Sequence, residues 1–520
     1  MGFADAGGRV IKPTLQGGIS SIYYAGSLIG GFLAGWFSDR YGRIKGIWVA
    51  CAFCAVGVIL QTAAVDLASI LVARIIAGIG VSFILVIAPS WTAELSPAAH
   101  RGNTIALTFL ANFSGITLAA WIGYGEFASY RIAQYTAHGV SATSYYNNGT
   151  GQFRWRFCFA SQIIPVVLII IGSFLIPESP RWLVKAGREK EAYDIIAAIR
   201  SNGDKEDAAA KREYQEIVQV VELEREHEGT NYIKMFLGVG SGEIHLGRRI
   251  QLAFWLQVLS MSSSLRRIIT VEVQFQLTYS VQYGTGIASV VIYSGTIFGL
   301  AGFSGHRSSL LSACLMVVGI IGTLIAAFTL DRVGRRRTLY WGAITLSIIL
   351  FIIGGLFRGA LNNPDKASQY GAAATAFVFL YLLVFSSSWL MIPFIYPTEI
   401  FPTWLRAKGN AFGVAGWAIG YGGGSLLVPV MFAGINEKTF YVFGAAMLCY
   451  IPLVYCFLPE TAGRSLESID FLFASSSAFT WKEEEEYQKR MAEFDRNIEH
   501  RNEKVETVHD ETPSAASEVV

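Results

Sequence analysis

Long uncharged apolar stretches recur along most of this 520-residue chain, and they constrain its fold more than any other feature. A helix of about 20 residues rises about 30 Å, which is the thickness of the hydrocarbon core of a bilayer. Only 15% of the residues are charged, whereas an average soluble domain has about 25%. We therefore predict an all-α polytopic membrane protein, because helices satisfy their own backbone hydrogen bonds in lipid.

The stretches predict where the helices lie. Ten spans are expected at 16–38, 46–65, 70–92, 104–124, 157–176, 309–330, 338–357, 372–396, 409–431 and 439–458, and one more lies within 250–302, which makes about eleven. Charged segments divide them. We predict an N-terminal helix bundle over 1–176, a cytosolic linker with short amphipathic helices over 177–247, a C-terminal helix bundle over 248–458 and a cytosolic tail over 459–520.

Lys and Arg gather in alternate loops, at 39–45, 94–103, 331–338 and 399–408. Positive loops stay on the cytosolic side of a membrane protein, so we expect these loops, the linker and the C-terminus in the cytosol. Asn148 then lies outside, where its Asn-Gly-Thr triplet is a glycosylation candidate. Such triplets also occur by chance.

Three short patterns occur twice in the same order. Asp39–Arg43 recurs as Asp331–Arg335, Glu94 with the following Arg101 recurs as Glu399 with Arg406, and Pro177–Ser179 recurs as Pro459–Thr461. Internal repeats of this kind are typical of secondary transporters built from two similar halves.

The repeat also predicts two irregularities. Two spans precede 331–335 in the second half but only one precedes 39–43, so we expect that the first span of an ordinary six-helix half is absent. Residues 260–281 contain Arg266, Arg267 and Glu272 and then alternate apolar and polar residues like a strand. A lone strand leaves its backbone unsatisfied in lipid. We hypothesise that 260–281 are an insert translated from a retained intron; the alternative is a re-entrant or extracellular loop.

In these motifs the chain resembles the sugar porter family of the major facilitator superfamily, in its fungal, lactose-permease-like branch. The resemblance runs from Gln16 to about Phe473 and rests on Gly35–Arg43, Arg74–Gly80, Pro177–Leu183, Tyr396–Pro402 and Pro459–Glu467. It implies the major facilitator fold, which consists of two pseudo-symmetric six-helix bundles. These motifs are specific for the family but not for a substrate.

A transporter of this kind rocks its two halves around a central site, so it needs a cytosolic lock that opens and closes. Carboxylates and arginines at span ends suit a lock, because partly hydrated ion pairs break at small cost. Arg can also cap the carbonyl end of a helix. The alternative is that these charges only set topology. We assign to the lock Asp39, Arg43, Glu94, Arg101 and Glu178 from the first half, and Asp331, Arg335, Arg336, Glu399, Arg406 and Glu460 from the second.

The resemblance also implies a central site of amides, hydroxyls and aromatic faces. Its candidates are Gln257, Gln282, Tyr283, Tyr293, Phe394 and Trp417, together with Phe109, which stands where hexose carriers usually have glutamine. Gly319 stands where they have asparagine. These departures put glucose in doubt and bring a disaccharide, polyol or related polar solute into consideration. For any one aromatic side chain, helix packing is the commoner explanation.

Arg74 is an ionisable side chain inside an expected span, and such a residue suggests a function. In proton-coupled members of the family the matching arginine pairs with an acid on the first span, so Arg74 is the proton-coupling candidate. The alternative is that it snorkels toward the outer end of its helix.

We therefore predict transport of a sugar or related polar solute by alternating access across the plasma membrane, either coupled to protons or by facilitated diffusion. The alternatives are a membrane sugar sensor that does not transport, and a non-functional product of a defective gene model. The chain lacks a phosphate loop, a nucleophile elbow and a metal-ligand cluster. We accordingly expect no enzymatic activity, no cofactor, no bound metal and no nucleic-acid partner, and we expect the lipid bilayer as its surroundings.

Overall fold

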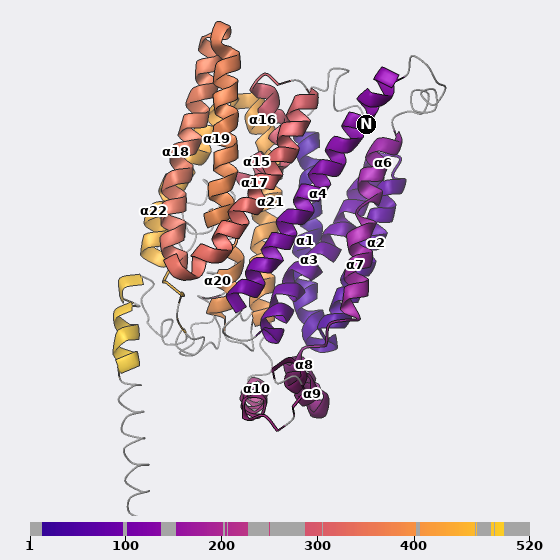
Figure 1. Cartoon of the computed structure of the whole chain (residues 1–520), viewed down its shortest axis with the longest axis vertical. Coiled ribbons are helices and arrows are strands. Elements are labelled where there is room, and N and C mark those ends of the chain that lie inside the picture. Colours follow the sequence, from indigo (N-terminus) through magenta and orange to yellow (C-terminus); the bar gives the residue numbers. More distant parts are fainter. Residues whose placement is uncertain are drawn as a thin grey trace, which may run out of the picture.

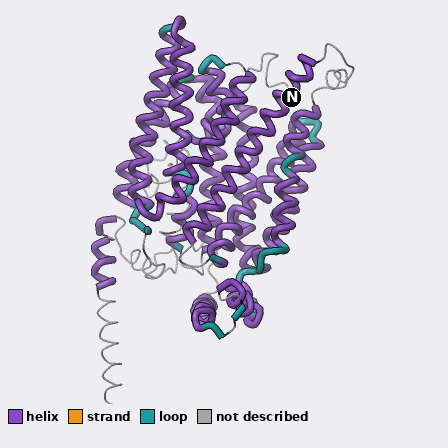
Figure 2. Tube along the Cα trace, viewed as in Figure 1, coloured by secondary structure: helices purple, strands orange, loops and turns teal. Residues whose placement is uncertain are grey.

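The structure is a computed structural model of the whole chain. It describes residues 13–96, 101–136, 152–200, 203–226 (without 205), 249, 286–401 (without 304), 406–464 (without 463) and 480–492 (without 483). The suspected insert at 260–281 lies outside these residues. All regular elements within them are helices, as Figure 2 shows, and this confirms the all-α prediction.

The helices fall into three groups along the chain. The first-half helices are α1 (Pro13–Tyr41), α2 (Arg43–Ala63), α3 (Leu67–Leu95), α4 (Arg101–Thr136), α6 (Gln152–Ala160) and α7 (Ile163–Ser173). The linker contains α8 (Pro180–Lys185), α9 (Glu189–Arg200) and α10 (Ala208–Glu226). The second-half helices are α15 (Ile287–Ile292), α16 (Ser294–Leu300), α17 (Gly305–Val333), α18 (Arg335–Asn362), the 3₁₀ turn η3 (Pro364–Lys366), α19 (Ala367–Ser388), α20 (Ile392–Ile400), α21 (Arg406–Ile435) and α22 (Lys438–Phe457).

The expected spans agree with these helices. Within the described residues, nine helical segments are long and apolar enough to cross a membrane, and each overlaps one expected span along most of its length. The other two expected spans correspond to α1 and to the broken pair α15–α16, neither of which is among the nine. α1 is less apolar because glycine, serine and tyrosine occupy much of its sequence.

Two sets of upright helices lie side by side, and the linker helices lie beyond one end of them (Figure 1). We call this end the linker end; it also carries residues 39–43, which contact the linker, and residues 331–335, where α17 ends and α18 begins. The halves meet where α1 packs along α21 and where α4 packs along α17. α3 contributes further contacts with α21. These helix pairs are the surfaces that would have to slide or separate if the halves moved.

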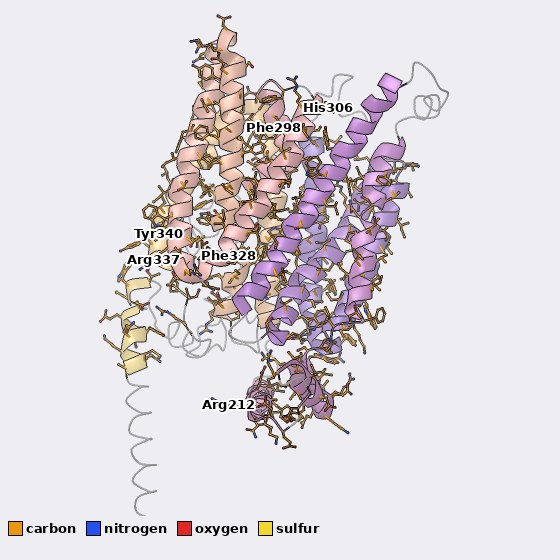
Figure 3. All side chains as sticks on the ribbon, in the orientation of Figure 1. Arg212, Phe298, His306, Phe328, Arg337 and Tyr340 are labelled. Atoms are coloured by element: carbon orange, nitrogen blue, oxygen red, sulfur yellow. The ribbon has the colours of Figure 1, made fainter. Side chains whose placement is uncertain are left out.

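Each half has an apolar interior and an apolar exterior. The interior of the first half centres on α2 and α3 with residues such as Ile47, Phe83 and Ile87, and the larger interior of the second half surrounds Tyr381 and Phe385 of α19. Large apolar side chains also point outward, including Phe328 of α17, which is 70% exposed and is labelled in Figure 3. An exterior of this kind is unfavourable in water and suits a lipid solvent.

Glycines allow the first-half helices to approach one another closely. A Cβ on Gly26 of α1 would lie 2.1 Å from the carbonyl oxygen of Ile75 of α3. A Cβ on Gly57 of α2 would lie 2.7 Å from Cβ of Ala77. Small residues at helix crossings are the usual basis of helix association in membranes. The α1–α3 contact therefore depends on the absence of a side chain at Gly26.

Gly26→Ala should destabilise the protein by about 1–3 kcal/mol, because the added methyl group forces two backbones apart. Gly18→Ala is the matched control, since nothing lies within 4 Å of a Cβ at Gly18 on the same helix. The measurement is the midpoint of thermal unfolding in detergent. Equal midpoints for the two variants would contradict a close α1–α3 contact at Gly26.

Candidate functional site

A cluster of charged residues joins α1, α2, α3 and the start of the linker at the linker end. Nε and Nη2 of Arg43 donate to the two carboxylate oxygens of Glu94, at 3.1 and 2.9 Å. Nη1 of Arg43 lies 3.6 Å from Asp39 and donates to the carbonyl oxygen of Ser38 at 3.0 Å. Arg43 thus links three helices and also caps the carbonyl end of α1.

Glu178 closes the same cluster from the linker. Its two carboxylate oxygens accept the backbone N–H groups of Arg43 and Ile44, at 3.0 and 3.1 Å. These are the first two residues of α2, whose amide groups have no partner inside the helix. A negative charge at a helix N-terminus is also favoured by the helix dipole. Glu178 therefore acts as a carboxylate cap on α2.

The second half repeats this arrangement. Nη2 of Arg335 donates to Glu399 at 2.8 Å, and its Nη1 lies 2.8 Å from Asp331. Glu460 accepts the backbone N–H groups of Arg335 and Arg336, the first two residues of α18, at 2.9 and 3.0 Å. The repeat found in the sequence is thus also a repeat of hydrogen bonds.

Two glycines make the carboxylate caps possible. Gly42 and Gly334 precede α2 and α18 and have φ of 102° and 94°, in the region that favours glycine. A Cβ on Gly42 would lie 2.7 Å from a carboxylate oxygen of Glu178, and a Cβ on Gly334 would lie 2.6 Å from one of Glu460. Each glycine therefore provides both the turn and the space for the carboxylate.

The two copies differ in their electrostatics. Burial raises the pKa of Glu94, but the Arg43 guanidinium and hydrogen bonds outweigh it, so the net pKa of Glu94 is lowered. Burial also raises the pKa of Glu399, and there Arg335 and a 2.6 Å hydrogen bond from Thr461 offset it only in part, so the net pKa is raised. The second copy therefore holds its carboxylate charge less firmly than the first.

The contacts described for the members of each cluster join residues of the same half. Arg43, Glu94 and Glu178 bind one another or first-half backbone, and Arg335, Glu399 and Glu460 bind second-half partners. Arg336 also stays in its half and donates through Nη2 to the carbonyl oxygen of Tyr455 and to Thr480. The side chains of the predicted members Arg101 and Arg406 lie outside what the structure describes.

A second group of candidates lies between the halves. Trp417 of α21 makes an edge contact with Tyr24 of α1, with ring centroids 5.2 Å apart, and a tilted contact with Tyr421 at 5.6 Å. Trp417, Tyr421 and Ser425 are spaced four residues apart, so they share one face of α21. Of these, only Trp417 was a candidate from the sequence.

Tyr293 joins this group from the break between α15 and α16. Its hydroxyl donates to the backbone carbonyl oxygen of Ser425 at 2.8 Å and also interacts with Ser20 of α1. Another pair of candidates meets across the halves, because the rings of Phe109 on α4 and Phe394 on α20 are 5.3 Å apart. The remaining candidates Gln257, Gln282 and Tyr283, and the glycosylation candidate Asn148, lie outside the described residues.

Arg74 lies on α3 on the side of the molecule opposite the linker end. Its guanidinium carbon is 5.9 Å from the ring centroid of Phe159. Its Nε is buried and has no hydrogen-bond acceptor among the residues that the structure describes. The structure therefore places Arg74 in the helix bundle, in contact with an aromatic ring.

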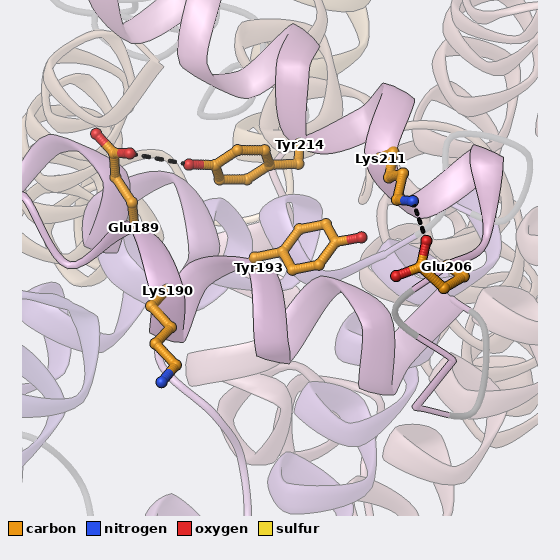
Figure 4. A pocket seen from close by; sticks show the side chains of 6 residues that line it. All are labelled: Glu189, Lys190, Tyr193, Glu206, Lys211 and Tyr214. Atoms are coloured by element: carbon orange, nitrogen blue, oxygen red, sulfur yellow. Dashed lines mark hydrogen bonds and ion pairs between the residues drawn. The ribbon is translucent and has the colours of Figure 1, made fainter.

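A shallow pocket lies away from these groups, between α9 and α10 of the linker (Figure 4). It is lined by Glu189, Lys190, Tyr193, Glu206, Lys211 and Tyr214. Its side chains pair with one another: Tyr214 donates to Glu189 at 3.1 Å, and Lys211 pairs with Glu206. Because these pairs are exposed, the pocket is a poor candidate for solute binding.

Several residues of the site were missed by the sequence reasoning. Tyr24 and Tyr421 were overlooked although Tyr421 follows Trp417 by one helical turn, a spacing that was visible in the sequence. In the sequence, Thr461 stood out only as the residue that matches Ser179 in the repeat. In the structure, Thr461 hydrogen-bonds Glu399 and Ser179 hydrogen-bonds Glu94. Tyr24 and Ser20 of α1 could be recognised as members of this group only in the three-dimensional structure.

Gly42→Ala should lower the free energy of unfolding more than Gly187→Ala. Both glycines have positive φ, but nothing lies within 4 Å of a Cβ at Gly187. The extra loss at Gly42 is expected to be about 1–3 kcal/mol, because Glu178 is displaced and leaves buried N–H groups without an acceptor. The measurement is unfolding in detergent followed by tryptophan fluorescence. Equal losses would mean that backbone strain alone explains the effect.

Comparison with known proteins gives the same family as these patterns. The model of the family described as "Sugar (and other) transporter" matches residues 7–473. The high-affinity glucose transporter of Kluyveromyces lactis is 28% identical, over 88% of this chain and 78% of its own. Polyol transporter 5 of Arabidopsis thaliana is 30% identical over the same shares.

The fold agrees with a solved transporter. The proton:xylose symporter XylE of E. coli superimposes with a TM-score of 0.66 at 24% identity, over 88% of this chain and 89% of that one. This likeness confirms the major facilitator fold predicted from the sequence. Because the family model covers most of the chain, the protein belongs to the sugar transporter family of the major facilitator superfamily.

Proposed function

We propose that this protein moves a sugar or a related polyhydroxylated solute across a membrane by alternating access. The observation that carries the proposal is the group Tyr24, Tyr293, Trp417 and Tyr421, which brings aromatic faces and hydroxyl groups together between the two halves. Aromatic rings cover the C–H surface of a sugar and hydroxyls exchange hydrogen bonds with its oxygens. A site between the halves is also the one that rocking exposes to each side in turn.

Gly319 bears on the class of solute. The family resemblance expects asparagine here, but a Cβ on Gly319 would lie 2.0 Å from the ring of Phe113 of α4. The Phe113 ring therefore occupies the space that an amide side chain would need. With an apolar ring there and Phe109 in place of glutamine, we propose a polyol, a disaccharide or a related polar solute in preference to glucose. The polyol transporter among the relatives supports this class.

We further propose that the linker end faces the cytosol of a cell whose plasma membrane contains the protein. The Lys and Arg residues near this end support that orientation. In this orientation each charged cluster holds the span ends of its own half in place at the cytosolic end. A role of the clusters as a lock between the halves stays a prediction. Coupling to protons is a separate proposal, for which Arg74 is the candidate residue.

The sensor alternative is weaker. The relatives described above are named as transporters, and they match this chain over most of its length. The same comparison gives no support to an enzymatic activity. Transport is therefore the function to test first.

Yeast that lacks its own hexose carriers should gain uptake of labelled polyols or sugars when it expresses this chain, or the same chain without residues 260–281. Trp417→Ala should then lower uptake at low solute concentration about tenfold, because the loss of a large aromatic contact costs about 1.4 kcal/mol. Trp341→Ala is the matched control, since Trp341 is 68% exposed on the outside of α18.

The outcomes are distinct. Equal uptake by the two tryptophan variants would remove Trp417 from the binding site. Binding of a solute without uptake would favour the sensor. Faster uptake in acidified medium would support proton coupling, and uptake that does not respond to acid would support facilitated diffusion.

A further inference from the structure

The described ion pairs of the two charged clusters do not account for the contact between the halves at the linker end. The contacts described for each cluster stay within one half, so these ion pairs do not themselves join the halves. Among the described residues, α21 packs against α1 and α3 at this end, and Ala411 and Val414 of α21 belong to the apolar core of the first half. Two more specific contacts are described there. One is the edge contact of Phe32 with Phe412, with ring centroids 5.3 Å apart. The other is a hydrogen bond.

This hydrogen bond runs from the side chain of Asn410 on α21 to Ser90 on α3. Nδ2 of Asn410 lies 3.1 Å from Oγ of Ser90. Both residues are buried, with 7% and 3% of their surface exposed. Ser90 donates its own proton to the carbonyl oxygen of Val86 at 3.1 Å, so its oxygen is available as an acceptor. Donor and acceptor therefore match, and the contact requires both halves.

The Asn410–Ser90 hydrogen bond lies close to the charged clusters of both halves. Ser90 is four residues before Glu94 on α3, so the two side chains lie on one face of the helix. Glu94 is held by Arg43, which fixes the end of α3 that carries Ser90. On the other side Gly409, next to Asn410, packs against Phe401, because a Cβ there would lie 2.3 Å from the Phe401 ring. Each partner therefore lies next to residues that are ion-paired or closely packed within its own half.

We propose that Ser90 and Asn410 form the clasp that closes the linker end between the halves, and that this clasp opens each time the solute leaves toward that end. The proposal rests on the proposed function, because only a transporter needs to open there. One neutral hydrogen bond suits a reversible contact, since water replaces the lost partner of each group when the end opens. A single bond of this kind shifts an equilibrium by about two- to tenfold.

The contact is tested by crosslinking the full chain. In Ser90→Cys/Asn410→Cys, a short bis-methanethiosulfonate reagent should join α3 to α21. A protease site inserted after Glu226 then separates the halves on a gel unless they are crosslinked. The control pair is Ile84→Cys/Asn410→Cys, because Ile84 lies six residues earlier on α3, about 9 Å along the helix axis. The single variants report any reaction with the native cysteines. A yield no higher than that of the control pair would overturn the proposal.

Opening is tested by two further readouts. In the reporter variant Ala411→Cys, which keeps both Ser90 and Asn410, residue 411 of α21 is fully buried against the first half. A maleimide should modify it about two- to tenfold faster when Ser90→Ala is added, as measured by peptide mass spectrometry. Equal rates would overturn the clasp. In cells that take up the solute, the Ser90→Cys/Asn410→Cys crosslink should stop uptake, and reductant should restore it. Continued uptake by the crosslinked protein would also overturn the proposed opening of the clasp.

These readouts separate the two proposals. Crosslinking and modification need no solute, so they test the Ser90–Asn410 clasp even if no sugar or polyol is taken up. Absence of uptake by the parent chain would count against the proposed function alone.

Discussion

The carboxylate caps of Glu178 and Glu460 are the interactions on which the rest of the structure depends. Each carboxylate accepts two backbone N–H groups at the start of a long apolar helix, α2 or α18. These amides would otherwise have no partner, and an unsatisfied buried donor costs about 1–3 kcal/mol. The caps also attach the linker and the segment after α22 to the helices, because both carboxylates belong to those segments.

The arginines extend each cap into a network. Arg43 and Arg335 are the first residues of the capped helices α2 and α18. Arg43 binds Glu94 on α3, and Arg335 binds Glu399 on α20. Three span ends are thus fixed relative to one another within each half. The halves themselves meet through close helix packing and a few neutral contacts, such as the Tyr24–Trp417 edge contact. Among the described residues the ion pairs lie inside the halves, whereas the extensive packing between the halves is neutral. Neutral packing of this kind suits two bodies that rock past each other.

The sequence predicted much of this, and the reasons are specific. The nine apolar segments could be found because a bilayer demands long uncharged helices, and the clusters could be found because Asp39–Arg43 and Asp331–Arg335 repeat. The partners of Glu178 could not be predicted, because they are backbone N–H groups, which every residue except proline has. Tyr24 and the Ser90–Asn410 pair depend on how α1, α3 and α21 cross, which sequence spacing does not determine. Gln257, Gln282 and Tyr283 lie outside the described residues, so their roles stay predictions.

The central claim is that the ion pairs of Arg43 and Arg335 hold each half together and do not join the halves. Double-mutant cycles in SDS-induced unfolding test it, using leucine at Arg43 with Glu94, at Arg335 with Glu399, and at Arg43 with Glu399. The account predicts coupling of about 1–3 kcal/mol within each of the first two pairs and additivity to within about 0.5 kcal/mol for the third. Coupling between Arg43 and Glu399 as large as that within either pair would contradict it.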